Sequence, residues 1–477
     1  MKIWRNQNGV ILPFILTVVI VMMGLGVAIA GIAVSNIRTA AAAQNSQEAL
    51  NIAEGGLNYY LWHLAHNPTD YQDGRTGQPG PPYGPFTHDF KNVAGKKIGT
   101  FALTITPPPN GSTITTVKVV GQVVNTRGAT TTGKRTLQAQ LGQPSFASYA
   151  WLSNSEMIFS TTSTTNGPVF SNSGIEFDGT NNGPVQSAVA QYQASSCGCI
   201  KAGVWGSGGP ASLWQYPVTQ IPFANVTANL SAIKTLANQA GGVCLGSAAS
   251  GCTGGSASGG IGFYLQLQSD GTIKKYRVNS ENAGCSTSVA ACLSTSLIGT
   301  IAAPTNGIIF STENLWISGT SWPKRTTIAA AKLPDPGSAA SRLSIKIIGN
   351  LTYAAKDGSD VLGLIAQQDI FIPKYITNSS PNVFEVDAAL LAQNGSIGFD
   401  TSSPYSLKNS FLGYGSMEQN QNAYGFKVQT CCPTTTIGGF PTTVYTFDTN
   451  LTYAPPPSFP TTGTYQILNW RELLNGP

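Results

Sequence analysis

Eight cysteines are the side chains of this sequence whose chemistry depends most directly on spacing. Cys244 and Cys252 enclose a short Gly-, Ser- and Ala-rich segment, and Cys285 and Cys292 enclose another, so either pair could close a small loop. An even count in an exported chain favours disulfides over free thiols, although sequence alone does not give the pairing. The full set is Cys197, Cys199, Cys244, Cys252, Cys285, Cys292, Cys431 and Cys432.

A metal site is the third chemistry open to these cysteines, and the sequence argues against it. The histidines, His63, His66 and His88, are remote from the cysteines in sequence, and no paired C-x-x-C motif is present. The adjacent Cys431 and Cys432 would form a strained bridge if they paired with each other. We therefore expect no metal and no cofactor.

Acid–base chemistry on a polysaccharide would need clustered charged side chains, as in the lyases and hydrolases built on parallel β-helices. Asp357, Asp360 and Asp369 with Lys356 are the candidates. Corner positions explain them better, because Asp favours turns, and a Ca²⁺ loop at 357–360 would lack a full ligand set. The sequence has no G-x-S-x-G, H-E-x-x-H or phosphate-cradling glycine motif. We predict no catalytic residues and no enzymatic activity.

Several aromatic side chains could stack on sugars if they were exposed. For each of them taken singly, packing in the core or at an edge is the expected role. These residues are Trp205, Trp214, Tyr216, Trp316 and Trp322.

The composition indicates an exported, β-rich chain with many turns. Of its 477 residues, 41% are hydrophobic and only 10% are charged, with 53 glycines and 29 prolines. The length predicts two or three structural units. A net charge of +5 without a dense basic patch makes nucleic acid an unexpected partner.

An uncharged apolar run, Val10–Val34, follows a basic segment, Met1–Gly9. Twenty-five residues at about 1.5 Å each can span a bilayer core of roughly 30 Å as a helix. Pro13 is tolerated in the first turn, and the preceding positive residues favour a cytoplasmic N-terminus with the rest exported. A cleaved secretory signal, with Ala28-Ile29-Ala30 as its cleavage site, and a plain membrane anchor are the alternatives.

An apolar stripe at helical spacing continues beyond the membrane segment. It predicts one unbroken helix from about Ile11 to His66, ended by Asn67-Pro68. A secretory signal has no reason to be followed by such an extension, whereas a pilin-type helix has one. The stripe consists of Ile37, Ala41, Leu50, Ala53, Leu57, Tyr60, Leu61 and Leu64.

Two features of this region resemble PilX-like and GspK-like minor pilins of type IV pilus systems. They are Gly9 before the apolar run and the stretch Ala49–Leu57, ALNIAEGGL. The resemblance implies cleavage between Gly9 and Val10 by a prepilin peptidase, followed by methylation of the new N-terminus. It also implies contact with other pilins through the helix.

The residue at the fifth position after the implied cleavage site departs from the major pilins. Those carry Glu there, paired with a neighbouring subunit's terminal amine, whereas this chain has Phe14. GspK-like minor pilins share the absence and are placed at the filament tip. We therefore predict a minor, tip-located or initiating subunit, and we expect Glu54 to be a solvated or head-facing residue.

The sequence after the helix predicts a small antiparallel meander within residues 67–145. A Gly- and Pro-rich loop, Tyr71–Phe86, precedes alternating β-branched segments at Phe101–Pro107, Thr113–Val124 and Lys134–Gly142. A helix followed by about three such strands is the arrangement of a pilin head.

Short strands with tight corners then predict a right-handed parallel β-helix over residues 146–196 and 305–477. Gly167-Pro168-Val169 recurs sixteen residues later as Gly183-Pro184-Val185, and paired short strands fill 307–400. A β-sandwich is the alternative. The segments GLIAQQDIFIP, PPPSFP and ILNWREL resemble the C-terminal module of large PilX-like surface proteins, which implies the same β-helix.

Residues 197–304 interrupt this pattern and predict a disulfide-rich α/β insertion. Helical spacing occurs in Phe223–Gly242, and Gly262–Val278 is a hairpin with its turn at Asp270-Gly271. The predicted fold class is therefore α+β and mostly β, made of a membrane helix, a meander and a solenoid with this insertion.

Together these features predict a minor pilin-like component of a type IV pilus or a related secretion filament. It would be a single-pass membrane protein before assembly and would lie at the cell surface afterwards, with an adhesive or structural head that binds a surface glycan or protein. The alternative is a membrane-tethered β-helix protein that binds or degrades glycans.

Overall fold

The computed structural model describes residues 11–109, 111–124, 131–226, 228–252, 259–282, 284–377, 383–421, 425–430 and 435–473. Gly9, Val10, Cys431 and Cys432 lie outside the described residues. The chain divides into two compact units, each treated by itself below. The first is Met1–Pro107 with Thr115–Gly142 and Tyr465–Pro477, and the second is Pro108–Ile114 with Gln143–Thr464.

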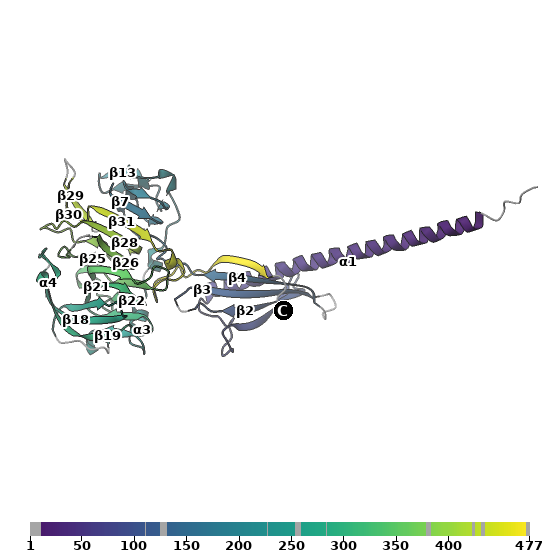
Figure 1. Ribbon diagram of the computed structural model, residues 1–477, viewed down its shortest axis with the longest axis horizontal. Helices are drawn as coiled ribbons and strands as arrows, with labels where there is room; N and C mark the ends of the chain where they lie inside the picture. Colours follow the sequence, from purple (N-terminus) through teal and green to yellow (C-terminus); the bar gives the residue numbers. More distant parts are fainter. Residues whose placement is uncertain are drawn as a thin grey trace, which may run out of the picture. The chain divides into compact units, whose positions relative to one another are not determined.

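The first unit begins with one helix, α1, from Ile11 to His66 (Figure 1). Its 56 residues run without a break, as predicted, and Pro13 lies in the first turn. Side chains from Leu12 to Gln44 are exposed, whereas burial begins at Asn45. Within the described residues, this is the one helix that is long and apolar enough to cross a membrane.

The second part of α1 packs on an antiparallel sheet. The buried helix residues are Ala49, Ile52, Ala53, Leu57, Tyr60 and Leu64, which largely follow the predicted stripe. The strands, in spatial order, are β1 (Tyr83–Lys91), β2 (Lys97–Thr106), β3 (Ile114–Val124), β4 (Thr131–Gly142) and β32 (Gln466–Leu473).

The predicted meander is confirmed in β2, β3 and β4, and the sheet has two further strands. β1 begins inside the segment that was expected to be a loop, and β32 comes from the far end of the chain to pair antiparallel with β4. Both are mostly exposed, with Phe86 the one fully buried side chain of β1. Neither strand therefore has the alternation of apolar residues by which sequence patterns reveal a strand.

Glycines set how closely the helix approaches this sheet. A Cβ on Gly121 of β3 would lie 2.1 Å from the Ala49 carbonyl oxygen and 2.6 Å from the Ala53 nitrogen. A Cβ on Gly56 of the helix would lie 2.7 Å from the Phe101 ring. Glycine within a helix costs about 1 kcal/mol relative to alanine. Gly56 makes room for the Phe101 ring, and Gly121 lets the strand approach the helix backbone.

The second unit is built on parallel ladders of short strands (Figure 1). One ladder pairs each strand with the next in the following spatial order: β16 (Val243–Leu245), β20 (Ile308–Ser311), β22 (Arg325–Ala330), β24 (Val361–Ala366), β26 (Val383–Ala392), β28 (Ser410–Gln419), β5 (Trp151–Ser153), β8 (Val169–Ser171) and β11 (Val185–Ser187). Every pair in it is parallel.

A short parallel ladder joins β6 (Met157–Phe159), β9 (Ile175–Phe177) and β14 (Val204–Trp205), and other strands form two longer ladders. One contains β17 (Gly262–Leu267), β21 (Asn314–Trp322), β23 (Ile345–Tyr353), β25 (Ile370–Ile372) and β27 (Ile397–Phe399). The other extends from β28 through β31 (Thr442–Phe447) and β7 (Ser163–Asn166) to β10 (Thr180–Asn181).

A column of buried side chains runs along the first ladder in exact register. This column joins Ile309, Ile328, Leu364, Leu390, Met417, Trp151, Val169 and Val185. The predicted sixteen-residue repeat is visible here, because Val185 pairs with Val169 and Ser187 with Ser171. Apolar side chains stacked in this way supply the main stabilising burial of the unit.

Strand order in the ladder departs from chain order. β28, late in the chain, pairs directly with β5, the first strand of this unit, and β31 pairs with β7. The two predicted solenoid segments therefore form one continuous stack. Sequence patterns predict where local strands lie, but they do not predict which distant strands pair with each other.

The predicted insertion is also part of the ladders. β16 pairs with β20 and β17 pairs with β21, although β17 forms the predicted hairpin with β18 (Thr272–Glu281). Helix α3 (Leu230–Ala237) lies in the region where a helix was expected, and it buries Leu230, Ile233 and Ala237.

Candidate functional site

The exposed half of α1 is the first candidate surface. Its residues from Ile11 to Ile37 carry no charge, and Arg38 is the first charged residue of the helix. Phe14 is 69% exposed, and the Thr17 hydroxyl donates to its backbone oxygen at 2.8 Å. This surface suits hydrocarbon or other apolar helices, and it offers no carboxylate at the Phe14 position.

Six of the eight cysteines form three disulfides. Cys197 bonds Cys199, Cys244 bonds Cys252, and Cys285 bonds Cys292. The two loop-closing pairs named from sequence are therefore bonded. None of the cysteines in the described ranges is free.

His63 joins the end of α1 to the segment after it, and His88 joins that segment to β1. His63 Nε2 lies 3.0 Å from Asp70 Oδ2, and His88 Nε2 lies 2.6 Å from Asp73 Oδ2. Tyr59 donates its hydroxyl to Asp73 at 3.3 Å. These contacts give the histidines a structural role. In the part of the chain that the structure describes, no group of three His, Cys, Asp or Glu side chains is placed to hold a metal.

The acidic residues singled out from sequence do not converge on one site. Asp357 accepts from the Ser359 amide, Asp360 from the Ala355 amide and Asp369 from the Ser396 amide, each at 2.9 Å. The Asp357 contact is the local kind expected for a turn residue, whereas the Asp369 contact joins residues 27 positions apart.

Lys356 instead meets two carboxylates that the sequence analysis did not identify. Its Nζ lies 3.1 Å from Glu385 Oε1 and 2.9 Å from Asp387 Oδ1. Asp387 is fully buried, and burial raises its pKa to about 6 although Lys356 opposes the rise. A carboxylate at an inward position of an apolar strand is the signal that could have revealed it.

The candidate sugar-stacking aromatics separate into two groups. Trp316 and Trp322 are buried, and their indole nitrogens donate to Tyr375 and Thr326 at 3.2 Å. Trp205 is half-buried beneath the Lys201 ammonium, 4.4 Å from the ring centroid. The first two therefore have the packing role that was expected.

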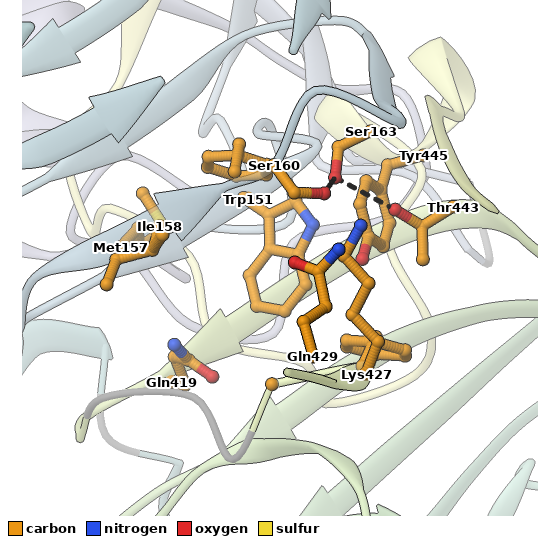
Figure 2. A pocket seen from close by; sticks show the side chains of 13 residues that line it. Trp151, Met157, Ile158, Ser160, Ser163, Gln419, Lys427, Gln429, Thr443 and Tyr445 are labelled. Atoms are coloured by element: carbon orange, nitrogen blue, oxygen red, sulfur yellow. Dashed lines mark hydrogen bonds between the residues drawn. The ribbon is translucent and has the colours of Figure 1, made fainter. Parts of the chain in front are cut away.

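Sequence reasoning missed a cavity of about 280 Å³ in the second unit (Figure 2). We call it the aromatic cavity. It is lined by Trp151, Met157, Ile158, Phe159, Ser160, Ser163, Gln419, Gly425, Phe426, Lys427, Gln429, Thr443 and Tyr445. Its residues come from strands at both ends of this unit's sequence, where β28 and β31 meet β5 and β7.

A cluster of aromatic rings lies in the lining of the aromatic cavity. The Trp151 ring centroid lies 5.4 Å from that of Tyr445, 6.2 Å from that of Phe426 and 6.3 Å from that of Phe159, all edge to face. Such edge-to-face clusters stabilise each other and hold the ring positions. The ring cluster is therefore pre-formed.

Hydroxyls and an amine line the cavity as well, on the same segments as the rings. Ser163 Oγ lies 3.1 Å from both Ser160 Oγ and Thr443 Oγ1, as the dashed lines in Figure 2 mark. Lys427 Nζ donates to Thr162 Oγ1 at 2.7 Å, and burial lowers its pKa. These side chains are groups that bind oxygen-rich ligands.

A second cavity, of about 380 Å³, has Glu281, Lys346 and Tyr375 in its lining. Glu281 forms an ion pair with Lys346 and accepts the Tyr375 hydroxyl at 2.6 Å. Glu281, Lys346 and Tyr375 therefore already have partners in one another, and they have little hydrogen-bonding capacity left for a ligand.

Comparisons with known proteins give no family. No protein-family model matches the chain, and no curated protein matches it. Three chains of solved structures match, among them the competence-associated pilin ComZ from Thermus thermophilus. That match covers 100% of both chains at 13% identity, with a TM-score of 0.30. Similarity at this level does not establish a shared fold, so the class of protein must be argued from the chain itself.

Proposed function

We propose that the chain is a minor pilin-like subunit of a type IV pilus or a related secretion filament. One observation carries the proposal: α1 has an uncharged, exposed first part and a second part packed on an antiparallel sheet. The first part suits a membrane and then the apolar core of a filament. The second part fixes the helix to a folded domain outside the membrane.

The subunit is processed and assembled through its N-terminal region. A prepilin peptidase cleaves between Gly9 and Val10, and the new N-terminus is methylated. The subunit is first a single-pass membrane protein and then contacts other pilins through α1. Phe14 supports a tip or initiating position, because it supplies no carboxylate for a neighbour's terminal amine.

The second unit is a surface-exposed head with a binding or structural role and no catalytic activity. Its parallel ladders and in-register core column support a right-handed parallel β-helix. Support for a non-catalytic head comes from the acidic residues, since Asp357, Asp360 and Asp369 are each engaged by a nearby backbone amide.

Shearing filaments from cells that carry an epitope-tagged chain tests the proposal. The tagged subunit should appear in the sheared fraction at a low ratio to the major subunit, and immunogold label should lie at filament ends. Deleting the gene should reduce filament number or attachment. Retention of the chain in the membrane fraction, with normal filaments and a lost glycan-cleaving activity, would contradict the proposal and favour the tethered-enzyme alternative.

A further inference from the structure

The aromatic cavity contains a cation whose charge is not balanced nearby. Lys427 is the one charged residue among the lining residues that the structure describes, and none of those is acidic. Its ammonium donates to a neutral oxygen, Thr162 Oγ1. Burial without a counter-ion disfavours the charged amine, so an anionic ligand would restore the balance.

Two further polar groups at the cavity lack partners. Trp151 is 3% exposed and Gln419 is fully buried, yet Trp151 Nε1 and Gln419 Nε2 have no hydrogen-bond partner in the described part of the chain. An unsatisfied buried donor costs about 1–3 kcal/mol. Both atoms are shielded from the cavity space in this structure, so a ligand there would contact other lining groups.

The lining combines the two kinds of group that bind a sugar ring, aromatic rings and hydroxyls. The aromatic rings of Trp151, Phe426 and Tyr445 provide a surface for C–H groups, and the hydroxyls of Ser160 and Thr443 can donate to or accept from ligand hydroxyls. The volume of about 280 Å³ lies just below the range of drug-sized sites, about 300–1,000 Å³, so it suits one ring rather than a longer chain.

We propose that the aromatic cavity binds a single hexuronate unit, such as a glucuronate at the end of a glycan. Lys427 pairs with the ring carboxylate, and Ser160, Ser163 and Thr443 bind the ring hydroxyls. The inference rests on the extracytoplasmic head proposed above, for which it names a ligand class.

Binding of a matched sugar pair to the full chain in detergent tests this inference. Methyl β-glucuronide and methyl β-glucoside differ in the carboxylate alone, and isothermal titration or ligand-observed NMR measures both. The glucuronide should bind at least tenfold more tightly, and this preference should shrink in high salt. Equal affinity for both sugars, or equal binding of benzoate, which has the carboxylate without ring hydroxyls, would overturn the proposal.

Substitutions of Lys427 distinguish the effect of its charge on sugar binding from any effect on folding. Lys427→Gln should abolish the preference for glucuronide, Lys427→Arg should retain most of it, and the exposed Lys274→Gln should leave it unchanged. Trp151→Phe should weaken glucuronide binding severalfold, with thermal melts confirming that each variant is folded. Wild-type selectivity in Lys427→Gln would refute the site. Leader cleavage and filament incorporation are measured separately, so failure here is distinguishable from failure of the pilin proposal.

Discussion

At the scale of single residues, Gly121 controls how closely α1 can approach its sheet. A side chain there would meet the backbone of α1 at Ala49 and Ala53, and backbone cannot move aside as a flexible side chain can. Gly121→Val should therefore lower the free energy of unfolding of this unit by about 3 kcal/mol. Gln122→Ala, on the next residue of the same strand, should change it by less than about 0.5 kcal/mol. Chemical denaturation in detergent measures both, and equal losses would contradict the packing argument.

Asp387 gives the second residue-scale prediction, which concerns pH. Burial raises its pKa from 3.8 to about 6, so folding favours the protonated form. The stability that Asp387 confers is complete below the pKa that its carboxyl has in the unfolded chain. That stability is lost as the pH rises through about 6, the pKa in the folded protein. Relative to Asp387→Asn, the wild type should lose about 3 kcal/mol of unfolding free energy between pH 3.5 and 7.

A carboxyl with the opposite perturbation serves as the control for Asp387. The hydroxyl and amide of Ser359 lower the pKa of Asp357, so its stabilisation is present at neutral pH and is lost on acidification. Asp357→Asn should therefore change the pH dependence in the opposite direction. If the difference in unfolding free energy between wild type and Asp387→Asn does not change with pH, Asp387 does not titrate between pH 3.5 and 7.

At the scale of elements, the disulfides differ in burial and in the length of the loop that each closes. Cys244 and Cys252 are buried in the main core and lie 8 residues apart, whereas Cys197 and Cys199 are exposed and lie 2 apart. Replacing Cys244 and Cys252 by Ser should cost about 2–3 kcal/mol, because a longer closed loop restricts the unfolded chain more. Replacing Cys197 and Cys199 should cost less, and calorimetry of the two double variants decides the order.

Local patterns in the sequence were enough to identify most elements. α1, three meander strands, the β17–β18 hairpin and the sixteen-residue repeat all follow from periodicity and turn chemistry. Sequence did not reveal β1 or β32, because edge strands with mostly exposed side chains have no apolar alternation.

Long-range pairing is the other part that sequence did not supply. The contact of β28 with β5 joins residues that lie more than 260 positions apart, and no local signal encodes it. The aromatic cavity forms at that junction, so it was missed together with the pairing. Trp151, Lys427 and Tyr445 are unremarkable in their own segments and become a site through the fold alone.

At the scale of the whole molecule, Phe14 tests the tip or initiating position that we propose for this subunit. Phe14→Glu would supply the carboxylate that shaft subunits offer to a neighbour's terminal amine. The ratio of this chain to the major subunit in sheared filaments should then rise severalfold. Phe14→Gln, which is similar in size and uncharged, should leave the ratio near that of wild type, and a rise in both variants would mean that charge is not the cause.

The N-terminal sequence of the mature chain tests the pilin proposal most directly. Mass spectrometry of the N-terminal peptide, taken from the sheared filament fraction, should find a chain that begins at Val10 with a methylated amine. A Gly9→Val variant should retain its leader and remain in the membrane. A mature wild-type chain that keeps Met1, or that begins after Ala30, would contradict the proposal.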